Sequence, residues 1–270
     1  MPRKTQGVYK PEISEPWELS RGKIADWREC EACFWLEKVK GVKPPKGPDF
    51  LINSLTDTLL KREMDEFRGK KPHPFFEHCG YPHLIPLDHP DLDKWVDARN
   101  FGKTDQHYNT VHKPTNIRFG GGIDDMFVNA KTGELHIVDY KSTAVREEGD
   151  FRPEQTLDSE YRKYYKWQMD MYVWIGRQRG LNISSESFFL YVDGQNRWED
   201  NVKMEGMWIA NDRWSKLHFY TTLIPYIADD SWVEDALFGA KETALKPKCP
   251  EHSDECEYGK YLAAAHKASQ

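Results

Sequence analysis

The stretch from Phe119 to Ala144, FGGGIDDMFVNAKTGELHIVDYKSTA, decides the fold of this chain because it predicts two adjacent strands. Residues 123–129 and 135–140 are both rich in side chains that favour β-structure. Residues 131–133, Lys-Thr-Gly, lie between the two runs and are typical of a turn. The sequence therefore predicts a β-hairpin.

Charged side chains on this hairpin are the first candidates for chemistry. Successive side chains of a strand point to opposite faces, so Asp139 and Lys141 are expected on one face and Tyr140 on the other. If Asp124 lies on the neighbouring strand, its carboxylate reaches the same place. Two close carboxylates repel each other unless a cation binds between them, and oxygen ligands suit Mg²⁺ or Mn²⁺. Asp124 and Asp139 are therefore predicted metal ligands, and Lys141 is predicted to hold the attacking water or a phosphate.

The pattern G-x-x-D, then a hairpin, then D-x-K resembles the active-site signature of the PD-(D/E)XK nuclease superfamily, especially its RecB-like exonuclease branch. In that branch the following helix carries Q-x-x-x-Y, and Gln168 and Tyr172 have this spacing in YYKWQMDMYVWIGRQRG. Residues four apart share a helix face. The resemblance implies that Gln168 and Tyr172 border the active site and touch the nucleic acid. The alternative to this role is that Gln168 is a polar residue at the edge, and Tyr172 an aromatic core residue, of an ordinary amphipathic helix.

The resemblance extends upstream and departs from the family at one position. LSRGKIADWRECEACFWLEKVKG resembles the N-terminal helical segment of RecB-like nucleases, with Cys30 at the place of their leading cysteine. That branch commonly has a glycine and, four residues later, a histidine metal ligand in a helix before the hairpin. Here the corresponding stretch ends at Asp57, and a carboxylate can replace an imidazole on Mg²⁺ or Mn²⁺. Asp57 is thus the candidate third ligand, with Glu63 next on the same helix, and a surface or capping role is its alternative.

Four of the five cysteines lie in two groups near the two ends of the sequence. Cys30 and Cys33 form C-x-x-C, while Cys249 and Cys256 come near the end. In a cytosolic protein such a set indicates metal binding before disulfides. Several RecB-like nucleases hold a 4Fe–4S cluster with one N-terminal and three C-terminal cysteines. The segment PKCPEHSDECEYGKYL resembles their closing motif, but Gly259 stands where the third of those cysteines would be.

This sequence has two cysteines near each end, and Cys33 is the candidate for the missing ligand, which would give four thiolates for an iron–sulfur cluster or a zinc ion. Zinc with His252 as a fourth ligand is a variant of this hypothesis. Four free thiols, left from a cluster-bearing ancestor, are the remaining alternative. The sequence does not choose among these, and Cys79 is expected to be an ordinary thiol.

Composition limits the classes of protein to consider. The 270 residues carry a net charge of −6, which argues mildly against a protein that coats nucleic acid. The mean hydropathy is −0.80 and no apolar run is long enough to span a bilayer. Residues 1–17 lack the apolar core of a signal peptide. We therefore expect a cytoplasmic protein that does not bind membranes.

Periodicity and turn residues predict the rest of the chain coarsely. Helices are expected over residues 17–40, 53–68 and 231–245, the last with Ser231 as N-cap, and loops over 71–90 and 146–158. A strand is expected over 187–192, and another strand or a strand-to-helix segment over 217–226. The resemblance implies an α/β, restriction-endonuclease-like fold with a mixed central sheet flanked by helices. We expect one domain over residues 1–270, with a helical part at 1–70, a catalytic core at 115–200 and a C-terminal helix and cysteine segment at 229–270.

These patterns together predict a Mg²⁺- or Mn²⁺-dependent deoxyribonuclease that acts on single strands or DNA ends, with DNA and a helicase or other DNA-processing protein as partners. One alternative is a catalytically inactive nucleic-acid-binding or assembly module on the same fold. Another is an unrelated metal-dependent hydrolase of small phosphorylated substrates, which needs a closed pocket.

Overall fold

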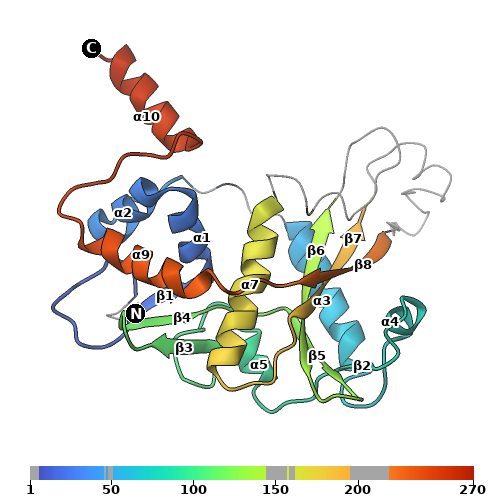
Figure 1. Cartoon of the computed structure of the whole chain (residues 1–270). Coiled ribbons are helices and arrows are strands. Elements are labelled where there is room, and N and C mark those ends of the chain that lie inside the picture. Colours follow the sequence, from blue (N-terminus) through green and yellow to red (C-terminus); the bar gives the residue numbers. More distant parts are fainter. Residues whose placement is uncertain (1–5, 46, 48–50, 144–156, 158–161, 195–218) are drawn as a thin grey trace.

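The computed structural model describes residues 6–45, 47, 51–143, 157, 162–194 and 219–270. Within them the strands form a five-stranded sheet, in the order β2-β5-β6-β7-β8, and a three-stranded sheet, in the order β1-β4-β3 (Figure 1). The strands are β1 (Trp17–Ser20), β2 (Leu84–Pro86), β3 (Asn109–His112), β4 (Ile117–Gly120), β5 (Asp125–Asn129), β6 (Leu135–Thr143), β7 (Glu186–Asp193) and β8 (Tyr220–Ile227). The helices are α1 (Arg21–Glu29), α2 (Glu31–Lys40), α3 (Leu51–Asp65), α4 (Pro74–His78), α5 (Leu92–Trp95), α7 (Lys163–Gln178), α9 (Val233–Leu245) and α10 (Glu257–Ala268). The expected mixed α/β class with helices flanking a mixed sheet is confirmed.

The predicted hairpin is present in the five-stranded sheet. β5 pairs antiparallel with β6, and Met126 lies opposite Ile137. Gly133 in the turn has φ 74°, a left-handed conformation that glycine adopts without steric cost. β6 then pairs in parallel with β7, so the chain must cross over between them. The helix α7 lies in this crossover and packs on the sheet.

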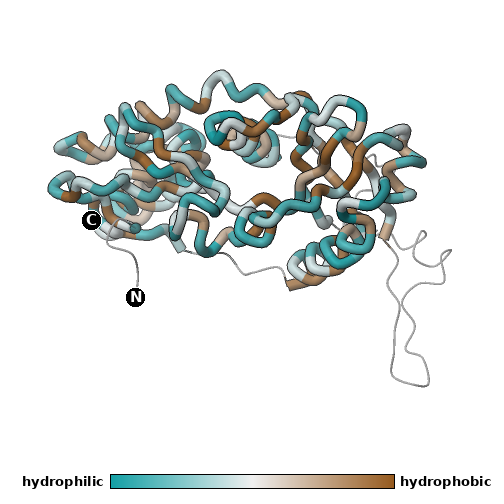
Figure 2. The backbone as a smooth tube through the Cα atoms, turned by 90° about the horizontal axis from the view of Figure 1, so that it is seen from below, coloured by the Kyte–Doolittle hydropathy of each residue, from teal (hydrophilic) through white to brown (hydrophobic). Residues whose placement is uncertain are grey.

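Helices cover both faces of the five-stranded sheet. α7 contributes Met169 and Val173 to a core that includes Ile137 and Phe189 of the sheet. On the other face, the side chains in the core come from α3, α4, β2, β5, β6 and β7: Met64, Phe76, Leu84, Phe127, Val138, Tyr140, Phe188 and Leu190. Figure 2 shows hydrophobic and hydrophilic residues alternating along the helices, as expected for helices with one face on a core.

The N-terminal prediction was wrong in one respect, because residues 17–40 are not one helix. Trp17–Ser20 is a strand, β1, that pairs in parallel with β4. Cys30 then separates α1 from α2, with an extended backbone at φ −157° and ψ 108°. A helical pattern in sequence does not reveal a partner strand about a hundred residues away, and the pairing with β4 overrides it.

Two other expected boundaries also differ. Residues 71–90, expected as loop, contain α4 and β2. The N-cap of α9 is Trp232 and not Ser231, whose hydroxyl instead donates to Asp229 Oδ1 at 2.6 Å. Strand β8 and helix α9 are otherwise close to their predicted ranges. The loop expected over 146–158 lies outside the described residues except for residue 157.

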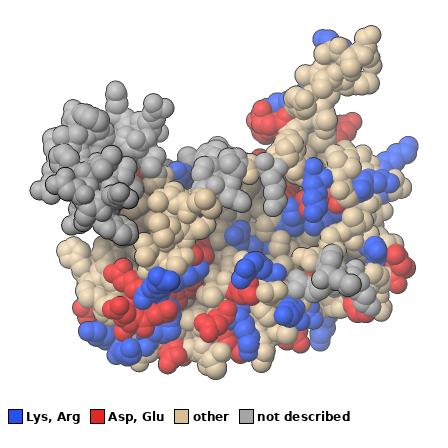
Figure 3. Space-filling model, turned by 180° about the vertical axis from the view of Figure 1, so that it is seen from behind, with Lys and Arg blue, Asp and Glu red and all other residues tan. Residues whose placement is uncertain are grey.

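The charges on the surface are mixed. On the face opposite to that of Figure 1, positive and negative side chains are interspersed (Figure 3).

α10 extends away from α1, α2 and α9 in Figure 1 and has no buried residue. Among the described residues no helix is long and apolar enough to cross a membrane.

A buried ion pair fixes α3 and the segment that follows it to the hairpin. Asp125, only 1% exposed, accepts hydrogen bonds from Arg68 Nη1 at 2.9 Å and Nη2 at 3.1 Å. The hydroxyl of Tyr140 donates to the same carboxylate at 2.7 Å. Asp125 therefore has a structural role on the side of the sheet away from α7.

The variant Arg68→Ala is expected to lower the free energy of unfolding by about 3–5 kcal/mol, because it leaves the carboxylate of Asp125 buried and unpaired. Equilibrium denaturation would measure this loss. Arg99→Ala is the matched control, since the Arg99 side chain is 91% exposed, and it should change stability by less than about 0.5 kcal/mol. Equal stability of the two variants would show that the pair contributes nothing.

Candidate functional site

The predicted charged group lies at the end of β6 that faces the start of β5. Asp139 is fully buried, at 0% exposure, on the face covered by α7. Its Oδ1 accepts a hydrogen bond from Gln168 Nε2 at 2.5 Å, and its Oδ2 is in ion-pair contact with Lys141 Nζ. Apart from that ion pair, Oδ2 has no hydrogen-bond partner among the described residues. This oxygen already faces one cation, the ammonium of Lys141.

Asp124 directly precedes β5 and supplies the second carboxylate. Its Oδ2 accepts a hydrogen bond from the backbone N–H of Tyr140 at 2.9 Å, which holds it beside the D-x-K segment. The other oxygen lies 4.0 Å from Lys61 Nζ, and Lys61 also bonds Asp57 Oδ2 at 2.9 Å. Asp57 is thus connected to Asp124 through one lysine, whereas Glu63 points to His73, 3.0 Å away.

The electrostatics of these groups fit a cation site. Burial raises the pKa of Asp139 to about 7, with Asp124 adding to the effect and Lys141 opposing it. Burial also raises the pKa of Asp57, and Asp124 raises it further. For Lys141, burial lowers the pKa, but Asp139 and Asp124 more than offset this and raise it overall. The two lysines, Lys61 and Lys141, neutralise carboxylates that a divalent cation would otherwise neutralise.

The predicted pair on α7 lies at this group. Gln168 Nε2 reaches both Asp139 and the hydroxyl of Tyr172, the latter at 3.3 Å, and Gln168 Oε1 accepts from Lys141 Nζ at 3.5 Å. The hydroxyl of Tyr172 donates to the carbonyl of Gly122. Gln168 and Tyr172 are therefore joined to Asp139, Lys141 and the segment before β5.

Sequence reasoning missed other side chains at this place. Arg21, the first residue of α1, donates from Nε to the hydroxyl of Tyr172 at 2.8 Å. The ring centroid of Tyr165 lies 4.6 Å from Lys141 Nζ, a cation–π contact. Arg21 is 151 residues from its partner in sequence, so no local pattern could have found it.

The run of three glycines before Asp124 has a packing reason. A Cβ at Gly121 would lie 2.9 Å from Arg21 Cγ and 3.3 Å from Tyr172 Cε1. A Cβ at Gly122 would lie 2.5 Å from the backbone nitrogen of Ala98. Only glycine permits these approaches, and the run was the one signal in the sequence that something passes close to this segment.

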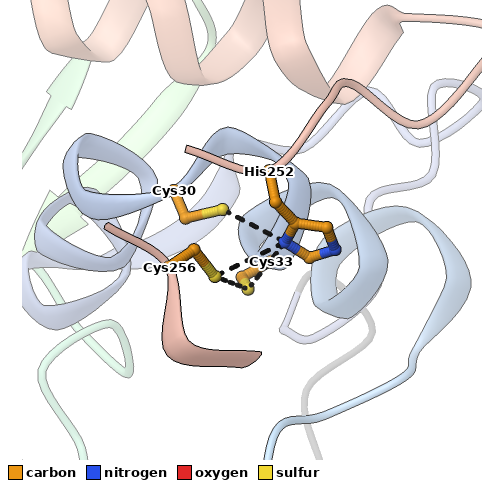
Figure 4. A group of neighbouring side chains, drawn as sticks. All are labelled: Cys30, Cys33, His252 and Cys256. Atoms are coloured by element: carbon orange, nitrogen blue, oxygen red, sulfur yellow. Dashed lines mark hydrogen bonds between the residues drawn. The ribbon is translucent and has the colours of Figure 1, made fainter. Parts of the chain in front are cut away.

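A second group, formed by cysteine and histidine, joins the two ends of the described chain. Cys30, Cys33, His252 and Cys256 point toward one another, and their ligand atoms all lie within 4.8 Å (Figure 4). The sulfur atoms of Cys30, Cys33 and Cys256 are 3.5, 3.6 and 3.4 Å from His252 Nδ1. This group could hold a metal ion. Among the described residues it is the one set of at least three such ligands that lies so close together.

The ligand set differs from the four cysteines predicted. Cys249 is exposed, and its sulfur lies 3.9 Å from the carbonyl of Ala32, outside the group. His252 takes the fourth place, because the C-terminal segment enters with its imidazole facing Cys30 and Cys33. Gly259, where the family motif has cysteine, has His252 against it: a Cβ there would lie 2.5 Å from His252 Cβ. Cys79 has no part in the group.

The pKa values of two thiols in this group are shifted in opposite directions. Burial by itself raises the pKa of Cys30, but the backbone N–H groups of Cys33 and Ser253, with His252 and Cys256, lower it to about 6. Burial raises the pKa of Cys33, and the adjacent sulfur atoms of Cys256 and Cys30 raise it further. A cation among the sulfurs would relieve the repulsion between thiolates.

Comparison of the chain with protein-family models, with curated proteins and with solved structures finds no match. The function is therefore inferred from the two groups of side chains.

Proposed function

We propose that this protein is a metal-dependent nuclease that hydrolyses phosphodiester bonds in DNA, built on a restriction-endonuclease-like core of the RecB-like kind. The observation that carries the proposal is the contact of Asp139 with both Lys141 and Gln168, beside Asp124. Five residues chosen from a sequence pattern, Asp124, Asp139, Lys141, Gln168 and Tyr172, are neighbours in space although three different segments supply them.

Asp124 and Asp139 would hold Mg²⁺ or Mn²⁺, since each offers a carboxylate and Oδ2 of Asp139 has no partner among the described residues except the ammonium of Lys141. Asp57 is the candidate third ligand, because Lys61 already connects it to Asp124. When bound, the metal ion lowers the pKa of a water molecule and polarises a phosphate oxygen.

The remaining side chains orient the reactants. Lys141 would release Asp139 to the metal and direct its ammonium group to the attacking water or the phosphate, where it offsets negative charge in the transition state. Gln168 holds Asp139 Oδ1 and so fixes the direction of the carboxylate. Tyr172 ties α7 to the carbonyl of Gly122, which keeps Asp124 close.

Basic and aromatic side chains near this centre favour a nucleic acid as substrate. Tyr165 presents a ring next to Lys141, and Arg162 lies beside the same ring at 5.8 Å from its centroid. Aromatic faces stack on unpaired bases, and cations contact the phosphates between them. These residues support action on single strands or on DNA ends.

Cleavage of end-labelled single-stranded and duplex DNA with Mg²⁺, Mn²⁺ or EDTA tests the proposal. We expect cutting with either metal and none with EDTA. Comparing the two labelled ends distinguishes exonucleolytic from endonucleolytic products. DNA binding without cleavage under every condition would favour the alternative, an inactive binding or assembly module on the same fold.

We also propose that the cysteine–histidine group holds one Zn²⁺ ion. Zinc bonds of about 2.3 Å to sulfur and about 2.0–2.1 Å to nitrogen give ligand–ligand distances of about 3.5–3.8 Å in a tetrahedron. The sulfur–nitrogen distances of 3.4–3.6 Å agree with this, and Cys33 Sγ lies 3.4 Å from Cys256 Sγ. A 4Fe–4S cluster attaches its ligands to four different iron atoms and needs them farther apart. Three thiolates and one imidazole are a common structural zinc set.

A further inference from the structure

Arg21 is a partly buried cation beside the candidate nuclease site that the chemistry proposed above does not use. It begins α1, and its Nε donates to the hydroxyl of Tyr172 at 2.8 Å. Burial by itself lowers the pKa of Arg21, but Tyr172, Asp139 and Asp124 raise it overall. The guanidinium therefore stays charged within electrostatic reach of both predicted metal ligands.

The outer nitrogen atoms of Arg21 are available for a ligand. Nε is bonded to Tyr172, whereas Nη1 and Nη2 have no hydrogen-bond partner in the part of the chain that the structure describes. The residue as a whole is partly exposed. A guanidinium presents its donors in a rigid planar fork that matches two oxygens of one phosphate group.

The protein also keeps room for this side chain. Gly121 leaves the space that the stem of Arg21 crosses, since a Cβ there would come within 2.9 Å of Arg21 Cγ. Tyr172 fixes the inner edge of the guanidinium, and the outer edge is left free. An arginine that only tied α1 to α7 would not need a free outer edge next to two carboxylates.

We propose that Arg21 is a phosphate-binding residue, whose Nη1 and Nη2 hold an oxygen pair of a backbone phosphate in the DNA strand at the Asp124–Asp139 centre. The proposal rests on the nuclease function proposed above and adds the residue that positions the strand. A metal ion bound to the two carboxylates would neutralise most of their negative charge, so they would no longer repel a phosphate. The positively charged guanidinium can then attract the phosphate. Tyr172 has a separate role, which is to hold the guanidinium in place.

The test measures binding of a fluorescent single-stranded oligonucleotide by anisotropy over a series of salt concentrations. Ca²⁺ replaces Mg²⁺, and a gel verifies that the strand stays intact. For each phosphate that the protein no longer neutralises, the slope of log Kobs against log salt concentration falls by about 0.7 for single strands. We expect this decrease for Arg21→Gln, with the wild-type slope restored in Arg21→Lys.

Two control variants distinguish the loss of this contact from the loss of any positive charge. Lys131→Gln removes the charge of an exposed lysine in the turn of the hairpin, and Arg99→Gln removes the charge of an arginine side chain that is 91% exposed; both should keep the wild-type slope. Thermal unfolding of each variant verifies that it is folded. An unchanged slope in Arg21→Gln, an equal decrease in Lys131→Gln or Arg99→Gln, or no DNA binding by the wild type would overturn the proposal.

A cleavage assay in Mg²⁺ on the same variants separates this proposal from the nuclease function. We expect Arg21→Gln to lower kcat/KM by about 10- to 100-fold, the effect of losing one charged hydrogen-bond donor that positions the strand. Cleavage by the wild type with an unchanged salt slope in Arg21→Gln would leave the nuclease and remove the role of Arg21. A decreased slope in Arg21→Gln without any cleavage by the wild type would keep the phosphate-binding role of Arg21 and remove the nuclease function.

Discussion

Lys141→Ala is expected to slow DNA cleavage by about 100- to 1,000-fold while Mn²⁺ still binds, whereas Asp139→Ala is expected to lose both cleavage and metal binding. The rate effect is that of removing one preorganised charged group from the transition state. The difference between the variants follows from the contact of Lys141 Nζ with Asp139 Oδ2. The ammonium competes with a metal ion for that oxygen, so its removal should leave Mn²⁺ affinity equal to that of the wild type or higher.

Single-turnover cleavage and calorimetric titration with Mn²⁺ would measure the two effects separately. Lys131→Ala is the matched control, because Lys131 is an exposed lysine in the turn of the same hairpin. It should cleave and bind metal like the wild type. Equal cleavage by the wild type, Lys141→Ala and Asp139→Ala would overturn the mechanism.

Loss of the cysteine–histidine site is expected to have the largest effect on stability. The purified protein should contain one zinc per chain by elemental analysis, and Cys33→Ser should lose it. We expect that variant to lose several kcal/mol of unfolding free energy, because metal bound only by the folded chain contributes its binding energy to folding. Protease cleavage between residues 246 and 256 should become faster at the same time, since the metal joins this segment to α1 and α2.

Cys249→Ser provides the control for the zinc site, because it removes an equally C-terminal cysteine that lies outside the group. It should keep zinc and stability. Iron with visible absorption in the wild type, lost in Cys249→Ser, would instead establish the four-cysteine iron–sulfur cluster suggested by the family resemblance.

The two candidate centres share one helix. α1 begins at Arg21, which contacts Tyr172, and ends at Glu29, next to Cys30 of the cysteine–histidine group. Arg28 on the same helix lies between the rings of Trp167 and Trp232, 4.3 and 4.1 Å from their centroids. A metal bound at Cys30 would therefore hold one end of a helix whose other end borders the proposed nuclease site.

Local patterns determined the parts of this protein that depend on neighbours in sequence. The hairpin of β5 and β6 follows from two β-rich runs around a glycine turn, and alternation along β6 is enough to place Asp139 and Lys141 on one face. The four-residue spacing of Gln168 and Tyr172 likewise places both on one face of α7. These features are set by backbone geometry within a few residues.

The features that join distant segments depend on packing in three dimensions. Trp17–Ser20 is a strand because β4 pairs with it, and Arg21 reaches the site because α1 packs against α7. His252, and not Cys249, lies with Cys30, Cys33 and Cys256 because the C-terminal segment packs against α1 and α2, with Ser253 bonded to the carbonyl of Glu29. Periodicity in a sequence records which side of an element is buried, but it does not record which distant element covers that side, and packing in three dimensions makes that choice.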